Sequence, residues 1–272
     1  MFEHLDILDE RHVNIVAEAI ASDRITCAVE DVFSTSANSE TLYGECLARL
    51  TGPDGRIYPA SAFVPCLDAW RETPVLDRHV LKLALDHLDA DPAKVLGCNI
   101  SADNFTSTAA WSGIRNRILD RAYLAPRLVL ELTEVQALGA LSFCADAIAE
   151  LQNIGCRIAL DDFGTGFASP RLLQMINFDI VKIDRAFVHD IRSSHNGRDS
   201  LQNMVGLASS FASLIVVEGV ETAAQLDAAR TAGASHVQGH FFQFQCNIPP
   251  TVTFLRCNDR AQDGFLSTDR QP

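Results

Sequence analysis

The sequence predicts an α/β fold whose parallel sheet closes into a barrel. Short runs rich in Val, Ile and Leu alternate with amphipathic stretches along most of the chain. Such runs are typical of strands that are buried on both faces, and their alternation with helices is typical of a parallel sheet. The number of runs favours a closed barrel, and an open doubly wound sheet is the structural alternative.

The expected strands follow the apolar runs in order: Val95–Ile100, Leu128–Leu132, Arg157–Leu160, Ile180–Ile183, Leu214–Val217 and His236–Phe242. The amphipathic stretches predict helices over Leu76–Leu88, Phe105–Ile118, Ser200–Ala212 and Thr222–Ala232. Another helix is expected from Leu141 to Leu151, with Gly155 at its end. Residues 1–23 are expected to form a leading helix and residues 258–272 a polar tail, which leaves one domain over residues 24–257.

Composition and charge exclude several functional classes. The chain is 47% hydrophobic and carries a net charge of −13, which argues against nonspecific binding to DNA. No apolar run is long enough to predict membrane insertion, and the first residues lack the pattern of a signal peptide. The 8 cysteines are scattered without a Cys-x-x-Cys pair, so we expect buried free thiols in a reducing cytoplasm.

Polar residues stand where the apolar runs end: Asn99, Glu131, Glu134, Asp161, Asp162, Lys182, Asp184, Glu218 and Gln238. The carboxyl ends of parallel barrel strands meet at one mouth, where barrel enzymes keep their sites. Any one of these carboxylates could be a solvated loop residue or a helix cap. Several of them at one mouth would repel each other unless cations lay among them.

Oxygen ligands of this kind suit Mg²⁺ or Mn²⁺. The adjacent Asp161 and Asp162 could hold two ions about 3.5–4 Å apart, which can activate water and stabilise displacement at phosphorus. Lys182 is expected either to pair with Asp184 or to orient or deprotonate the attacking water. The pattern therefore predicts hydrolysis of a phosphodiester. From spacing alone, a barrel lyase or racemase that abstracts a proton with Lys182 is a further alternative.

The motifs taken together resemble those of the EAL domain, the cyclic di-GMP phosphodiesterase module of bacteria. They occur in that family's order as Glu45-Cys46-Leu47-Ala48-Arg49, Asn99-Ile100-Ser101, Glu131-Leu132-Thr133-Glu134, Asp161-Asp162-Phe163-Gly164-Thr165-Gly166, Lys182-Ile183-Asp184, Glu218-Gly219-Val220-Glu221-Thr222 and Gln238-Gly239. The resemblance spans residues 24–247, nearly the whole chain.

The resemblance implies a modified TIM-type (β/α)8 barrel that hydrolyses cyclic di-GMP to linear pGpG with two Mg²⁺ or Mn²⁺ ions. It assigns the first ion to Glu45, Asn99, Glu131 and Asp161, and the second to Asp161, Asp162 and Glu218. Lys182 would position the water, with Asp184 and Gln238 nearby, and Arg49 would contact a substrate phosphate.

The resemblance also implies a coupling between the site and a dimer partner. The loop of Asp162, Phe163, Gly164, Thr165 and Gly166, braced by Glu134, would link metal binding to homodimer contacts. A regulatory protein partner acting in trans is expected as well.

The first strand departs from the family pattern. Val29-Glu30-Asp31-Val32 stands where Gln-Pro-Ile is usual, and His240 replaces a tyrosine. Glu30 and Asp31 are expected to bring negative charge near a dianionic substrate and to weaken its binding. The alternative function is therefore a low-activity or inactive EAL-type domain that acts as a cyclic di-GMP sensor or a protein-interaction module.

Overall fold

The computed structural model describes residues 10–36, 40–133, 141–165, 170–193 and 197–242. Within these residues the strands form a single sheet in the order β1-β9-β8-β7-β6-β5-β4-β2-β3, and β1 also pairs with β2. The sheet therefore closes into a barrel, with β3 added outside it, which confirms the predicted fold class. The strands are β1 Ile25–Ser34, β2 Thr41–Thr51, β3 Ile57–Pro59, β4 Leu96–Ile100, β5 Leu128–Thr133, β6 Arg157–Phe163, β7 Ile180–Ile183, β8 Leu214–Val217 and β9 His236–Gln238.

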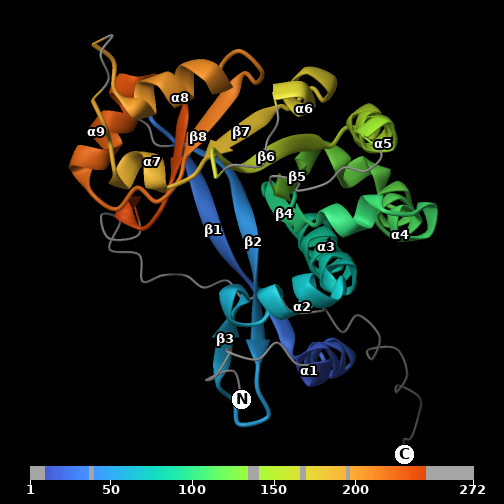
Figure 1. Cartoon of the computed structure of the whole chain (residues 1–272). Coiled ribbons are helices and arrows are strands. Elements are labelled where there is room, and N and C mark those ends of the chain that lie inside the picture. The colour runs from blue at the N-terminus through green and yellow to red at the C-terminus, as the bar shows by residue number, and fades with distance from the viewer. Residues whose placement is uncertain (1–9, 37–39, 134–140, 166–169, 194–196, 243–272) are drawn as a thin grey trace, which may run out of the picture.

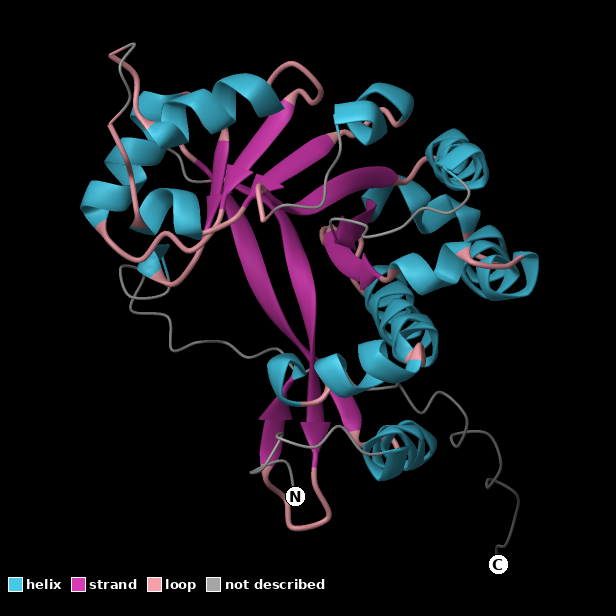
Figure 2. Cartoon of the chain, viewed as in Figure 1, coloured by secondary structure: helices cyan, strands magenta, loops and turns pink. Residues whose placement is uncertain are grey.

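Helices surround the barrel on its outside (Figure 2). They are α1 Glu10–Ala21, α2 Val64–Trp70, α3 Thr73–Ala90, α4 Thr108–Leu119, α5 Leu141–Ile154, α6 Pro170–Met175, α7 Ala186–His189, α8 Ser200–Ala208 and α9 Ala223–Ala232. Short 3-10 helices lie at η1 Ala60–Ala62, η2 Ala102–Phe105 and η3 Ala122–Arg127. No helix within the described ranges is both long and apolar enough to cross a membrane.

The sequence alone suggests a wholly parallel sheet, but the observed sheet is mixed. Strand β1 runs antiparallel to both of its neighbours, β2 and β9. Only residues 35–40 join β1 to β2, and a parallel pair would need a crossover of a dozen or more residues. The two strands form a long hairpin that extends past the other strands toward β3 and α1 (Figure 1).

The predicted elements agree with the structure except at some ends. Strand β9 ends at Gln238, four residues before the expected Phe242. Gly239 follows it with a φ of 143°, and a Cβ there would lie 2.5 Å from the Val220 backbone nitrogen, so the chain turns away at this point. The leading helix is α1, whereas residues 1–9 and the expected polar tail lie outside the described part of the chain.

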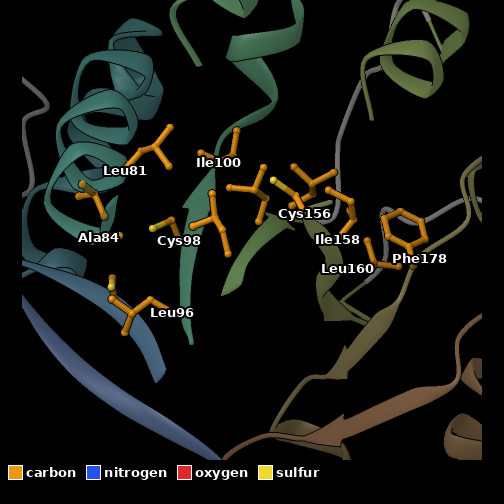
Figure 3. Close-up of a cluster of buried hydrophobic side chains, with 14 of the residues drawn as sticks. Leu81, Ala84, Leu96, Cys98, Ile100, Cys156, Ile158, Leu160 and Phe178 are labelled. Atoms are coloured by element: carbon orange, nitrogen blue, oxygen red, sulfur yellow. The ribbon is translucent and has the colours of Figure 1, made fainter. Parts of the chain in front are cut away.

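Two apolar clusters hold the barrel. Between sheet and helices, Leu81 and Ala84 of α3 face Cys98 and Ile100 of β4 (Figure 3). The cysteines of the described ranges are buried free thiols, as expected. Inside the barrel a small layer comprises Val32, Tyr43, Val129, Ala159, Ile180 and Val216. This inner layer forms an apolar floor, and the strands continue from it toward the mouth.

Candidate active site

On five of the strands, a charged residue of the barrel mouth follows a residue of the apolar floor by two positions. Because side chains alternate across a strand, a residue two positions after an inward-facing one also faces inward. The steps are Tyr43 to Glu45, Val129 to Glu131, Ala159 to Asp161, Ile180 to Lys182 and Val216 to Glu218. The sequence folds locally so that one apolar ring supports one ring of charged groups.

Lys182 is the centre of this acidic cluster. Its Nζ lies 3.0 Å from Glu45 Oε2, 2.6 Å from Glu131 Oε2, 2.9 Å from Asp161 Oδ1 and 2.8 Å from Glu218 Oε1. The lysine side chain is only 1% exposed. The pairing with Asp184, one of the two alternatives for Lys182, is not among its ion pairs in the described ranges. Asp184 Oδ1 instead accepts a hydrogen bond from the Ala186 amide at the start of α7.

The cluster holds more carboxylates than the single charge of Lys182 can neutralise. Burial lowers the pKa of Lys182, but Asp161, Glu131 and the other carboxylates outweigh it and raise that pKa well above its usual value. Burial raises the pKa of Glu218 to about 8, against the opposing effect of Lys182. It also raises the pKa of Glu131 well above the usual range, with Glu45 adding to the effect. One ammonium therefore does not balance these acids.

The carboxylates fall into two groups, each compact enough to hold one ion. Ligand oxygens of Glu45, Glu131 and Asp161 lie within 4.8 Å of one another, and so do those of Asp161, Asp162 and Glu218. Asn99 adjoins the first group, where its Nδ2 donates to Glu45 Oε1 at 2.8 Å. The all-oxygen donor set and the excess of negative charge both fit hard divalent cations.

The two aspartates face the site together because the backbone is irregular there. Asp162 has a φ of 54°, and the register between β6 and β7 shifts between Leu160 and Phe163. In a regular strand neighbouring side chains point to opposite faces, so this irregularity is what brings Asp162 to the cluster. Burial and the charge of Asp161 raise the pKa of Asp162 to about 6.

The loop after Asp162 is described only in part. Thr165 donates through its amide and its Oγ1 to the Asp162 carbonyl, at 3.2 Å and 3.0 Å. Phe163 is buried, and Gly164 has a φ of 108° against the ring of Phe187. Glu134 and Gly166 lie outside the described residues.

Two other expected residues, Gln238 and Arg49, lie at different distances from the cluster. Gln238 is buried, and its Nε2 donates to Glu45 Oε2 at 2.7 Å. Arg49 shares the face of Glu45, four residues further along β2, but its guanidinium donates to the carbonyls of Leu47 and Ala48. The structure therefore joins Gln238 to the cluster and leaves Arg49 at the rim, bonded to its own strand.

Glu30 and Asp31 lie on opposite faces of β1. Glu30 is the cross-strand partner of Glu45 and shares its inward face. Burial raises the pKa of Glu30, and the charge of Glu45 raises it further. Asp31 is exposed on the opposite face, where its Oδ1 lies 3.1 Å from the position of a Cβ on Gly44. Of these two acids, only Glu30 therefore lies on the face of the barrel mouth.

A cavity of about 340 Å³ adjoins the cluster. Asn99, Asp161 and Asp162 line it, and so do Asp68 and Asp77 from outside the recognised motifs. In the sequence, Asp77 is distinguished only as the one acidic residue on the buried face of α3.

Asp77 supports the turn that follows Asn99. Its Oδ2 accepts from the Ser101 amide at 2.8 Å, from Ser101 Oγ at 2.7 Å and from Asn104 Nδ2 at 2.6 Å. Burial raises the pKa of Asp77 to about 7, although the hydrogen bonds from Ser101 oppose this. The carboxyl is therefore protonated over much of the acidic range.

Replacing Asp77 by asparagine is expected to flatten the dependence of the free energy of unfolding on pH. Unfolded aspartate titrates near pH 3.9, so the folded state binds more protons than the unfolded state up to about pH 7. Stability is full below the unfolded pKa and is lost as pH rises through the folded one, by about 2 kcal/mol between pH 5 and 7. Urea titrations at both pH values test this, with the exposed Asp120→Asn as control. Equal pH slopes for Asp77→Asn and wild type would contradict it.

Comparison with known proteins places this geometry in a family. The family model for the EAL domain matches residues 13–244. The cyclic di-GMP phosphodiesterase NbdA of Pseudomonas aeruginosa is 28% identical over 248 residues, which are 88% of this chain and 31% of NbdA. The protein named "Probable cyclic di-GMP phosphodiesterase PdeA" of Escherichia coli is 32% identical over 202 residues, 73% of this chain and 28% of that protein. The chain thus spans less than a third of either relative.

Solved structures share the fold of this chain. The structure titled "PaMucR Phosphodiesterase, c-di-GMP complex" aligns with a TM-score of 0.71 and 24% identity over 85% of this chain and 95% of its own. The FimX EAL domain from Pseudomonas aeruginosa, bound to c-di-GMP, aligns with a TM-score of 0.73 and 22% identity over the same shares. These likenesses support the barrel architecture. Because the family model covers most of the sequence, the chain belongs to the EAL domain family.

Proposed function

We propose that this chain hydrolyses cyclic di-GMP to linear pGpG with the help of two Mg²⁺ or Mn²⁺ ions. The observation that carries the proposal is the pair of carboxylate groups that share Asp161 around the buried Lys182. The phosphodiesterase names of NbdA and PdeA support the substrate. A lyase or racemase fits less well, because enolate chemistry does not need two adjoining cation sites.

The residues present have distinct tasks in this reaction. Glu45, Asn99, Glu131 and Asp161 would hold one ion, and Asp161, Asp162 and Glu218 the other. The bound ions would polarise the phosphodiester and lower the pKa of the attacking water. Lys182 Nζ, an ammonium held by four carboxylates that raise its pKa, would orient that water as a hydrogen-bond donor. Gln238 would hold Glu45 in orientation, and Asp184 would lend charge from the start of α7.

The neighbouring cavity suits a guanine base. Guanine presents N–H donors on its Watson–Crick edge, and carboxylates are acceptors for such donors. Asp68 puts a carboxylate on the wall of this cavity, which Asp161 and Asp162 also line. A base in this cavity would place its phosphate near the cluster, within reach of Arg49 once that guanidinium leaves its own strand.

The test is an assay of the purified chain with cyclic di-GMP, followed by chromatography for pGpG. We expect turnover with Mg²⁺ or Mn²⁺, none in EDTA, and little with Ca²⁺, whose longer and looser coordination misplaces the water. Undiminished activity in EDTA would overturn the metal assignment. Tight binding of cyclic di-GMP without pGpG would favour the second candidate, a sensor or interaction module, which is supported by the unusual Glu30 beside Glu45.

Glu30→Gln is expected to lower KM for cyclic di-GMP by about 10- to 100-fold with little change in kcat. One like-charge pair about 6 Å apart at an effective dielectric of about 20 costs on the order of 2–3 kcal/mol, less with salt screening. A neutral amide could instead donate a hydrogen bond to a phosphate. Asp31→Asn, on the opposite face, is the matched control and should leave KM unchanged. If Glu30→Gln behaves like Asp31→Asn, then Glu30 does not face the substrate.

We further propose that the chain works as a homodimer in the bacterial cytoplasm, with a regulatory partner in trans. The support is the family loop that begins at Asp162, whose Gly164 adopts a left-handed φ that lets the loop pass the ring of Phe187. Light scattering at assay concentrations should give twice the chain mass. A monomer with full activity would rule out a catalytic need for the dimer.

A further inference from the structure

His189 lies at the end of α7 and contacts the loop that follows Glu218. Its Nε2 is 2.8 Å from the carbonyl oxygen of Gly219, the residue directly after Glu218. A carbonyl oxygen can only accept, so this ring nitrogen carries the hydrogen and donates it. The bond therefore joins α7 to the chain next to a member of the second carboxylate group.

The position of His189 is set by α7 itself. This helix begins shortly after Asp184, whose Oδ1 accepts from the Ala186 amide, and the buried Val188 anchors it in the core. The His189 amide donates to the Arg185 carbonyl at 3.0 Å, which closes the turn. The imidazole thus reaches the loop from a short helix that is fixed at the barrel mouth.

Gly219 leaves the space in which the imidazole meets the loop. It has a φ of 66°, and a Cβ there would lie 2.4 Å from Arg185 Cβ and 3.2 Å from His189 Nε2. A side chain at this position would be strained by its backbone and would push against α7. The close approach of α7 to the loop therefore depends on the glycine.

Glu218 has less support from packing than the other acids around Lys182. Its side chain is 18% exposed, whereas the side chains of the other three carboxylates are 0–11% exposed. Its amide donates to the Ile183 carbonyl at 3.0 Å, which fixes the start of the loop but not the peptide that follows. A restraint on that peptide would steady the carboxylate.

Backbone bonds hold the far side of the same loop. The Val220 amide donates to the Gln238 carbonyl at 2.9 Å, and the Phe241 amide donates to the Val220 carbonyl at 3.0 Å. These bonds do not involve His189, so the loop would stay attached to the barrel without the imidazole. What would be lost is the restraint on the peptide next to Glu218.

We infer that His189 is a positioning residue whose bond to Gly219 holds Glu218 in the orientation that binds the second ion. The inference rests on the two-ion part of the proposed function and adds a residue that lies outside the recognised motifs. Partners that orient a ligand from outside commonly change metal affinity about 10- to 100-fold when they are removed. Because Glu218 belongs only to the second carboxylate group, the effect should fall on one ion and spare the other.

His189→Leu removes the donor and tests this role. We expect calorimetric titration with Mn²⁺ to show the Kd of one ion raised about 10-fold and that of the other unchanged. His189→Gln, whose amide nitrogen can still donate to the Gly219 carbonyl, should restore most of the lost affinity. Arg192→Leu is the matched control: this exposed cation follows α7 and pairs with Asp190 on the surface, so both ions should bind as in the wild type.

Glu218→Ala identifies which ion is affected. It should remove the second ion, and adding His189→Leu to it should leave the Kd of the remaining ion unchanged, because a residue that acts through Glu218 has nothing further to lose. The Tm of His189→Leu in EDTA should fall by no more than about 4 °C, as expected for one hydrogen bond in a domain of this size.

Unchanged Mn²⁺ affinities in His189→Leu would overturn the inference. So would an equal weakening of both ions with a larger fall in Tm, since His189 would then serve the fold alone. Failure of His189→Gln to restore binding would show that the N–H group is not what matters, and would overturn it too. Wild-type protein that binds fewer than two Mn²⁺ ions would overturn the inference together with the two-ion proposal, and that case is seen before any variant is compared.

Discussion

Lys182→Ala is expected to lower kcat for cyclic di-GMP by about 10²- to 10³-fold at saturating Mn²⁺, the range typical of a hydrogen-bond donor that acts in the transition state. Nucleotide binding should remain close to wild type, and Mn²⁺ should bind more tightly, because the ion replaces the positive charge that the variant has lost. In EDTA the variant should lose about 3–5 kcal/mol of stability, because four buried carboxylates lose their common counter-ion. Mn²⁺ should restore most of this loss by supplying positive charge at the same place.

The two effects separate two roles of the lysine. Chemical denaturation with and without Mn²⁺ measures the structural role, and steady-state kinetics at saturating metal measures the catalytic one. Lys82→Ala, a half-exposed lysine paired with Asp86, is the matched control and should change neither. If Lys182→Ala kept wild-type kcat once Mn²⁺ was bound, Lys182 would be a counter-ion only. A raised KM with unchanged kcat would make it a substrate clamp.

Asp161→Ala is expected to abolish Mn²⁺ binding detectable by calorimetry and to reduce turnover by more than about 100-fold. Loss of a residue that only orients a metal ligand costs at most about 100-fold, and loss of a ligand should cost more. Asp161 belongs to both carboxylate groups, so its removal disrupts two sites at once. Glu45→Ala removes a ligand of the first group alone, and we expect the same loss of activity because the proposed displacement needs both ions.

Control variants show whether these losses are specific to the carboxylate groups. Asp227→Ala removes an exposed aspartate on α9 whose ion pair with Arg230 lies on the surface, so metal binding and turnover should be unchanged. Circular dichroism should show that all variants are folded. Full activity of folded Asp161→Ala would contradict the two-ion proposal, whatever the behaviour of Glu45→Ala.

The sequence predicts the parallel part of the fold well for a physical reason. Strands β4 to β8 are covered on both sides, so their residues form nearly unbroken apolar runs that stop where polar groups begin. Strands β1 and β2 lack such runs because their inner faces carry Glu30, Glu45 and Arg49. The sequence therefore hides the hairpin that closes the barrel, although it shows the motif carried on β2.

The sequence predicts which residues form the candidate site, but not which of them contact each other. Spacing alone indicates that the ends of the runs converge. It favours no particular partner for Lys182, and its nearest acid in sequence, Asp184, instead serves the start of α7. The hydrogen bond from Gln238 to Glu45 joins the last strand to the second, and no local pattern encodes such a contact.

The position of β1 between β2 and β9 also matters for how the protein is made. On the ribosome the β1–β2 hairpin can form early, but the ring cannot seal until β9 has left the exit tunnel. Gln238 on this last strand bonds Glu45 on the second, so the site matures only when synthesis of the barrel is complete. Translation products that end before β9 would then lack both the closed ring and the bond from Gln238 to Glu45 in the candidate site.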